Sequence, residues 1–294
     1  MLISVVNHSN IRDEDVQIAI RAVNRQIAED FEPHWHIGGA LKLEGALSEN
    51  PNLNLMATNM RGNAIIYLED EYDENDPFGF HDRNQEGIPF GVVFTELAEN
   101  LGEPWQVTFS HEALELLADP EVNRLVMGPH PDYPDEDVFH WLEVCDAVQA
   151  EQYEIDHIPV SNFVLPLYFT GGEEWGGRND FLGTRIGEGS LTSFNVNPGG
   201  YVGFYDPFLG GHDQVFADKK AKERNKVKQK FGIARRGTRY QKNDQVLENL
   251  MATRGKIGKP KPRFAATIRK PVIVKPQIRR PDPRKPNPRK PGGG

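Results

Sequence analysis

The segment SHEALELLADP, residues 110–120, carries the densest group of chemically active side chains in this sequence. We expect it to form a helix that ends at Asp119, because the residue before a proline is pushed out of the right-handed helical region. Residues four apart lie on one face of a helix, so His111 and Glu115 can point at one ion with Glu112 beside them. This arrangement follows the H-E-x-x-H motif of zinc enzymes, with Glu115 in place of the second histidine.

A second group of candidate ligands lies in the segment EVCD, residues 143–146. If the helix supplies two ligands, a third must come from elsewhere, and Glu143 and Asp146 are three positions apart, so a helix or a turn can present both. One imidazole and two or three carboxylates are, as a set of ligands, harder Lewis bases than those of a histidine-rich zinc site. Such a set admits zinc and also calcium or manganese. The candidate metal ligands are therefore His111, Glu115, Glu143 and Asp146.

The segments before this helix predict a sheet. Apolar runs at residues 2–6, 41–43, 64–68 and 89–95 are typical of strands. Residues 13–30 predict an amphipathic helix with three acids in its first turn. Its apolar positions have helical spacing: Val16, Ile20, Val23 and Ile27. This order indicates an α+β or α/β protein in which the sheet is assembled before the helix at 110–119.

Charge divides the chain into two parts. Of its 34 basic residues, 25 lie in residues 216–294, together with only 5 of its 43 acidic residues. Residues 1–215 therefore carry a net charge of about −29 and residues 216–294 about +20, although the whole chain has −9. We expect a folded acidic domain, 1–215, and a basic, proline-rich, largely disordered tail, 216–294. Such a polycation would bind nucleic acid or another acidic partner, or it would lie on the acidic domain itself.

Composition excludes several classes of protein. No apolar run approaches the length of a membrane span, and the N-terminal residues lack the pattern of a secretory signal. The single cysteine, Cys145, excludes an internal disulfide framework and a zinc site made of several cysteines, and it suits a reducing compartment. We therefore expect no membrane partner and a location in the cytoplasm, meaning the host cytoplasm or the virion if a phage encodes the chain.

The blocks WQVTFSHEALELLADP, WLEVCDAVQ, SNFVLPLYF and PGGY carry a resemblance to a known family. Over about residues 35–201, the chain resembles mostly uncharacterised bacterial and phage proteins that have an HExxE helix followed by an ExxD segment. That family looks like a divergent branch of the zincin-type metallopeptidases. The resemblance implies an α+β, zincin-like fold, with a mixed sheet packed on the N-terminal helix and the HExxE helix. It also implies a metal held by His111, Glu115 and a carboxylate from Glu143 or Asp146, with Glu112 as general base.

These features predict a metal-dependent hydrolase of peptidase type, acting on a peptide or protein. The metal would polarise a scissile carbonyl, and Glu112 would take a proton from the bound water and pass it to the leaving amine. Stabilising the resulting oxyanion needs a donor, and the sequence offers four without choosing among them: His130, Tyr133, His140 and Tyr153.

Simpler interpretations stand beside this one. The alternative from another class is a non-enzymatic phage structural or accessory protein, in which the HExxE segment binds a structural ion or nothing and the tail binds nucleic acid. Glu112 and Glu115 would then be solvated helix residues. We expect Cys145 to be a small buried apolar residue rather than a nucleophile. His81 and Asp82 follow an acidic, turn-rich stretch and are expected in a solvated loop that precedes a strand.

Overall fold

A computed structural model describes residues 1–44, 62–70, 79–83, 87–100, 102–171, 178–183, 185–186, 189–219 and 221–222. The chain splits into two compact units, Met1–Glu248 and Asn249–Gly294, and all of the described residues belong to the first. Described structure continues past 215, since Ala221 is fully buried and Asp218 accepts a hydrogen bond from the Gly199 N–H. The rest of the predicted tail, from 223 onward, lies outside the described residues.

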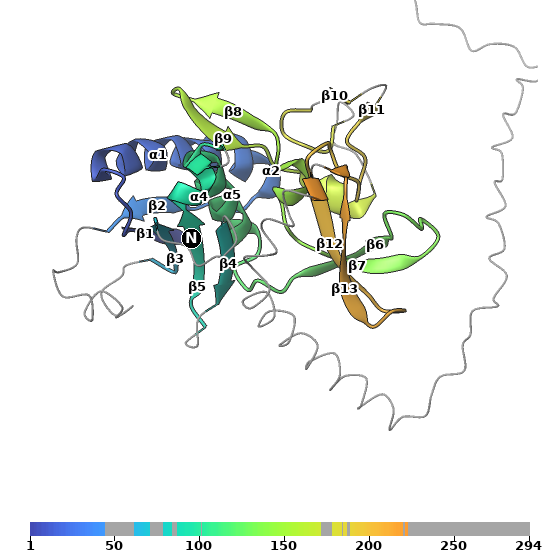
Figure 1. Cartoon of the computed structure of the whole chain (residues 1–294). Helices are drawn as coiled ribbons and strands as arrows, with labels where there is room; N and C mark the ends of the chain where they lie inside the picture. The colour runs from blue at the N-terminus through green and yellow to red at the C-terminus, as the bar shows by residue number, and fades with distance from the viewer. Residues whose placement is uncertain are drawn as a thin grey trace, which may run out of the picture. The chain divides into compact units, whose positions relative to one another are not determined.

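The first sheet has five strands in the order β2-β1-β3-β5-β4 (Figure 1). Four of them are parallel and match the predicted runs: β1 (Leu2–Asn7), β2 (Ala40–Leu43), β3 (Ala64–Glu69) and β5 (Pro89–Phe94). The fifth, β4 (Gly79–Arg83), joins β5 in antiparallel pairing. The prediction of a solvated loop at His81 and Asp82 was therefore wrong, because these residues form one of the outer strands of the sheet.

The predicted N-terminal helix is present in two parts. α1 (Asp13–Arg25) continues into a π-helical turn (Gln26–Phe31), followed by the short α2 (Glu32–Trp35). The four apolar residues with helical spacing are all buried, and they fix this helix against the sheet and its neighbours. α1 packs against β2, so the pattern read from the sequence identified the correct face.

The second long helix is α5 (Trp105–Ala118), preceded by α4 (Thr95–Asn100). It begins at Trp105 rather than at Ser110, and it ends where expected, since Asp119 leaves the helical region with φ −132°. α5 packs against β4 and β5 and touches α1, so both long helices lie on one face of the sheet (Figure 1). Most of its side chains are buried, which makes it a core helix rather than a surface helix.

Two antiparallel units follow α5. The hairpin β8 (Gln152–Ile155) and β9 (Ile158–Ser161) packs on α1 and α5, on the side away from the first sheet (Figure 1). The second sheet has the order β13-β12-β7-β6. Its strands are β6 (Leu125–Pro129), β7 (Asp137–Trp141), β12 (Tyr201–Asp206) and β13 (Gly211–Phe216).

Short elements complete the described chain. Two 3-10 helices, Asp146–Val148 and Pro166–Thr170, and the two-stranded ladder β10 (Arg185–Ile186) and β11 (Gly189–Ser190) lie between the larger units. The described part of the chain is thus α+β, with one mixed five-stranded sheet, one four-stranded antiparallel sheet and two antiparallel pairs of strands.

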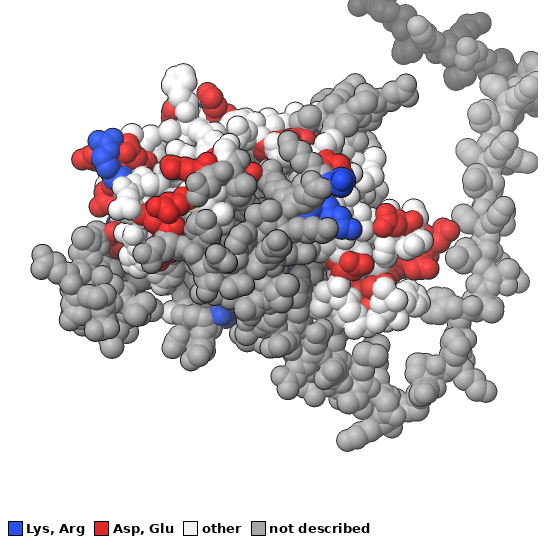
Figure 2. Space-filling view, viewed as in Figure 1, with Lys and Arg blue, Asp and Glu red and all other residues white. Residues whose placement is uncertain are grey.

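The surface of the described part agrees with its charge count. On the face drawn in Figure 2, acidic side chains gather over α1 and around the loop between β6 and β7, and basic side chains are sparse. Among the described residues, no helix combines the length and the apolar character that crossing a membrane requires.

Candidate metal centre

α5 presents three chemically active side chains to the interior. His111 and Glu115 are one turn apart, and His111 Nε2 lies 3.2 Å from Glu115 Oε2. Glu112 and Glu115 are both buried, although carboxylates are rarely found inside a protein unless they are paired. The interpretation of these two residues as solvated helix positions was therefore wrong. The helix is fixed at this point by Ser110, whose Oγ accepts a hydrogen bond of 2.7 Å from the Ser161 N–H on β9.

The chain returns to α5 after the second sheet has begun. Residues 142–148 run beside the helix, and the Cys145 N–H donates a hydrogen bond of 3.1 Å to Glu115 Oε1. Asp146 opens the 3-10 helix that follows, and its Oδ1 lies 3.4 Å from His111 Nε2. The segment EVCD thus reaches the helix through a backbone donor as well as through its carboxylates. Cys145 is fully buried, as expected.

A residue that sequence analysis had placed in a loop completes the cluster. His81 lies on β4, which packs against α5, and its side chain is 4 % exposed. Its Nδ1 is 3.1 Å from Glu112 Oε2 and 3.6 Å from Glu115 Oε2, and its Nε2 is 3.5 Å from Glu143 Oε2. The only sequence signal for a strand here is the pair Phe78 and Phe80 around Gly79, because aromatic residues favour strands.

The six side chains form one buried network centred on Glu115. The members are His81 from β4, His111, Glu112 and Glu115 from α5, and Glu143 and Asp146 from the returning segment. Glu115 Oε2 is the oxygen that faces both imidazoles, since Oε1 is held by the Cys145 N–H. Within the described residues, the ion pairs of Glu112, Glu115 and Asp146 are all with His81 or His111 rather than with a lysine or an arginine.

The pKa values in the cluster are shifted because several carboxylates are buried close together. Burial alone would lower the pKa of His81, but Glu143, Glu112 and Glu115 outweigh it and raise the pKa to about 9. Burial would also lower the pKa of His111, but nearby carboxylates, chiefly Glu115 and Asp146, raise it well above its ordinary value. Burial, helped by the charge of Glu143, raises the pKa of Glu115 to about 8. Without a cation, the cluster therefore holds protons that a cation would displace.

Within the part of the chain that the structure describes, two sets of three residues have donor atoms close enough to share one ion. One set is His111, Glu115 and Cys145, and the other is His81, Glu115 and Glu143, with the donor atoms of each set within 4.8 Å of one another. Burial and the nearby Glu115 raise the pKa of the Cys145 thiol well above its ordinary value, which makes the thiol a weaker donor than the Asp146 carboxylate beside His111. All four predicted ligands thus belong to one network with the predicted base Glu112, but they do not form one donor set. Glu143 falls in the set with His81, and Asp146, which lies beside His111, falls in neither set.

Of the four candidate oxyanion donors, three have hydrogen bonds outside the network and the fourth is exposed. The Tyr153 hydroxyl donates to Asp30 Oδ2, and His140 Nε2 bonds to the Pro129 carbonyl. His130 Nδ1 accepts from two backbone N–H groups of its own loop, and Tyr133 is 60 % exposed. The structure brings none of these four into the network described above.

Comparisons with known proteins found no match to this chain. No family model matches the chain, and neither a curated protein nor a solved structure matches it. The functional interpretation therefore rests on the residues of the cluster.

Proposed function

We propose that this protein is a metal-dependent hydrolase with peptidase-like chemistry, and that His111, Glu115 and Asp146 hold its metal ion. The observation that carries the proposal is the buried network of two imidazoles and four carboxylates around Glu115. Among the described residues, the ion pairs of Glu112, Glu115 and Asp146 are with histidines only. Burying such acids costs several kcal/mol per ion unless a cation compensates them. A structural surface helix would gain nothing from this arrangement.

The donor set fits a divalent cation. One imidazole and two carboxylates suit zinc, which takes nitrogen and oxygen ligands, and they also suit manganese. Calcium fits less well because it prefers a shell made only of oxygens. When bound, such a cation supplies a Lewis acid and lowers the pKa of a bound water towards about 7.

Glu112 is the residue suited to proton transfer. It lies next to His111 on the same helix, and its Oε2 faces His81 rather than an arginine or a lysine. A carboxylate in this position can accept a proton from the attacking water and return it to the leaving amine. His81 holds the carboxylate in place through the 3.1 Å contact, so its orientation does not depend on solvent.

The architecture is compatible with a zincin-like fold, which we include in the proposal. A mixed sheet carries an antiparallel outer strand, β4, next to the helix that bears the HExxE residues. An N-terminal helix, α1, packs beside that helix on the same face of the sheet. The resemblance implied a mixed sheet packed on these two helices, and it made no prediction about an antiparallel outer strand.

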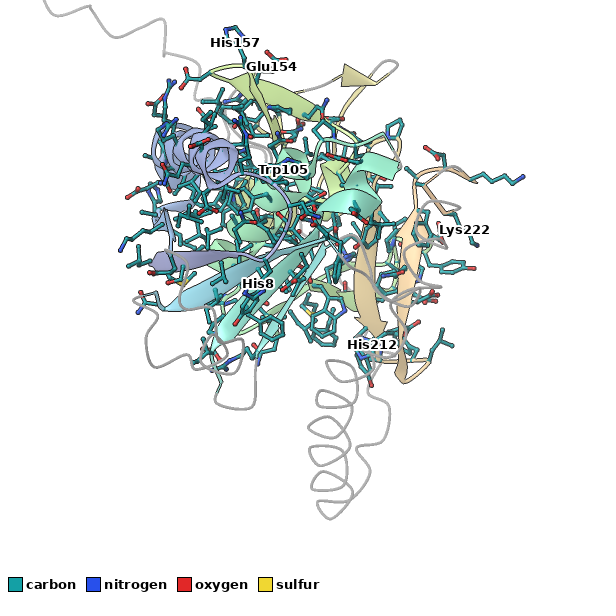
Figure 3. All side chains as sticks on the ribbon, turned by 60° about the vertical axis from the view of Figure 1, so that its left-hand side comes forward. His8, Trp105, Glu154, His157, His212 and Lys222 are labelled. Carbon is teal, nitrogen blue, oxygen red and sulfur yellow. The ribbon has the colours of Figure 1, made fainter. Side chains whose placement is uncertain are left out.

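The test is hydrolysis of unfolded casein and of a fluorogenic peptide library by the full chain and by Glu112→Gln. Glutamine keeps the oxygen that faces His81 but cannot accept the proton, so we expect the rate to fall about 10²–10⁴-fold while the metal is retained. The matched control is Glu154→Gln, at an exposed position at the tip of the β8–β9 hairpin (Figure 3). Equal rates for Glu112→Gln and the unmodified chain would contradict the proposal.

A second function is favoured by a separate observation, the charge of residues 216–294. We propose that these residues, with about +20, bind nucleic acid through its phosphates. Removing residues 223–294 should abolish binding to a 30-base-pair DNA duplex and leave the metal content unchanged. With 6–10 phosphate contacts, the affinity should fall about 10³–10⁵-fold between 50 and 200 mM salt. An affinity that does not depend on salt would contradict this second proposal.

A further inference from the structure

His81 has one ring nitrogen that the rest of the described structure does not use. Its Nε2 is buried and has no hydrogen-bond partner among the described residues, although the side chain is only 4 % exposed. A buried polar atom without a partner costs about 1–3 kcal/mol, so such atoms usually mark a bound group. The nearest acidic atom facing it is Glu143 Oε2, at 3.5 Å, which is too long for a hydrogen bond.

The other ring nitrogen is arranged as in a histidine that binds a metal. Nδ1 lies 3.1 Å from Glu112 Oε2, within hydrogen-bond distance. Histidine ligands almost always donate their second ring N–H to a carboxylate or a carbonyl, which fixes the tautomer and aims the free nitrogen at the ion. With the proton on Nδ1 and donated to Glu112, the lone pair of Nε2 points towards Glu143. His81 therefore has both a free donor atom and the partner that would orient it.

The two imidazoles face opposite parts of the network. His111 Nε2 is beside Glu115 Oε2 and Asp146 Oδ1, whereas His81 Nε2 is beside Glu143. Glu115 belongs to both sets of donor atoms that could hold an ion. A carboxylate between two histidine–carboxylate pairs is the usual bridging ligand of a dinuclear centre, in which the ions lie about 3.5–4 Å apart.

We propose that the cluster has a second cation position, held by His81 Nε2, Glu143 and Glu115, and that Glu115 is shared with the ion of the proposed hydrolase. The inference rests on that proposed centre and extends it from one ion to two. Each position has one imidazole and carboxylates, which suits Mn²⁺ or Zn²⁺. Four carboxylates also supply enough negative charge to compensate two divalent ions. Glu112 then has a positioning role towards His81 in addition to its role as a base.

The experiment uses the full chain, dialysed against EDTA, reloaded with Mn²⁺ or Zn²⁺, and passed through a desalting column before elemental analysis. We expect two ions per chain. His81→Gln and Glu143→Gln should each bind one, as should Asp146→Asn, and Glu115→Gln should bind none. His157→Ala is the control for surface binding, because His157 is exposed and lies near Glu154 at the hairpin tip (Figure 3), and it should still bind two.

The electron paramagnetic resonance spectrum of the Mn²⁺-loaded chain gives a second readout that does not depend on activity. Two bridged ions should give an exchange-coupled spectrum, and His81→Gln should convert it into the six-line spectrum of an isolated ion. One ion per chain in the unmodified protein would overturn the second position, whether or not His81→Gln removes that ion. The proposed hydrolase would survive this result if Glu112→Gln still abolished hydrolysis, so the two failures are distinguishable. The thermal unfolding of each metal-free variant establishes that it is folded.

Discussion

Buried histidines occur in two regions of this molecule, and their surroundings give them opposite properties. His81 and His111 lie between the first sheet and α5, where they face carboxylates. His140 lies on β7 of the second sheet, where Phe194 and Phe204 pack against its ring at centroid distances of 4.7 and 5.8 Å. All three are largely removed from water, so burial alone does not distinguish them.

The pKa shifts of these histidines differ because the groups that contact their rings differ. Burial lowers the pKa of His140, which favours the neutral ring, and its Nε2 donates to the Pro129 carbonyl. Burial also opposes the charging of His81 and His111, but the carboxylates around them reverse the net shift. A buried histidine thus indicates a binding site only when buried acids lie beside it. In the proposed centre, the carboxylates of residues 112, 115, 143 and 146 therefore distinguish His81 and His111 from His140.

Zinc-induced stabilisation should distinguish the two regions most strongly. Zinc at about 100 times its Kd should stabilise the metal-free chain by about 2.7 kcal/mol, because it binds the folded state only. Glu115→Gln should lose this stabilisation, since Glu115 faces both histidines of the cluster. His140→Phe should retain it in full.

Thermal unfolding with and without zinc measures the effect. A rise in Tm for Glu115→Gln as large as that of the unmodified chain would show that zinc binds elsewhere. Loss of the rise in His140→Phe would show that the two regions are not independent.

The pH dependence of stability should have opposite signs in the two regions. In the metal-free protein, the pKa of His81 is about 9 rather than 6.5, and that of Glu115 is about 8 rather than 4.5, so both bind protons more tightly in the folded state. Their contribution to the free energy of unfolding is lost as pH rises, between about 4.5 and 8 for Glu115 and between 6.5 and 9 for His81. The pKa of His140 is lowered, so its contribution is present above pH 6.5 and is lost as pH falls below that value.

Unfolding in EDTA from pH 5 to 9 tests this difference. We expect the Tm to fall between pH 6.5 and 9, by about 2–4 °C for each kcal/mol lost. His81→Gln should flatten the alkaline part of the curve, and His140→Phe should flatten the acidic part. If His81→Gln left the alkaline slope unchanged, the carboxylates would not be raising the pKa of His81.

The smallest effect is expected from a steric change confined to the second region. A Cβ at Gly128 on β6 would lie 2.5 Å from the ring of Phe194, which packs on His140. Gly128→Ala should destabilise the chain by about 1–3 kcal/mol in urea unfolding. The rise in stability with zinc should be the same as in the unmodified chain, because distant sites contribute additively. A changed zinc response would mean that the second sheet shapes the cluster.

Sequence analysis predicted the parts of this architecture that depend on local patterns. The apolar spacing of α1, the positions of four strands and the end of α5 at Asp119 follow from periodicity or from the proline rule, and the structure confirms them. The parallel pairing of these strands was not predicted. Glu143 and Asp146 were predicted to supply a third ligand, and the structure places Asp146 beside His111 of α5 and Glu143 beside His81 of β4. His81 was missed because its burial depends on the packing of β4 against α5. The sequence of a five-residue strand contains no signal for that packing.

The second sheet was the other feature that sequence analysis did not predict. Its outer strand β13 includes His212 (Figure 3). The His212 ring stacks on Trp141 of β7 at a centroid distance of 5.3 Å. Its strands come from distant parts of the chain, with β6 and β7 before the hairpin and β12 and β13 after glycine-rich turns. Such pairing between remote segments leaves no short-range signal. For this reason His140 on β7, and His130 and Tyr133 in the loop before it, could not be placed from sequence alone.

Elemental analysis of the purified full chain, beside His111→Ala and His140→Ala, tests the central claim most directly. The claim is that the network around Glu115 is a metal centre, whereas the aromatic surroundings of His140 are not. We predict that the unmodified chain and His140→Ala contain the same stoichiometric amount of a divalent metal, and that His111→Ala contains at least one ion fewer per chain. Full metal content in His111→Ala, or a chain that binds no divalent metal when loaded with zinc or manganese, would contradict it.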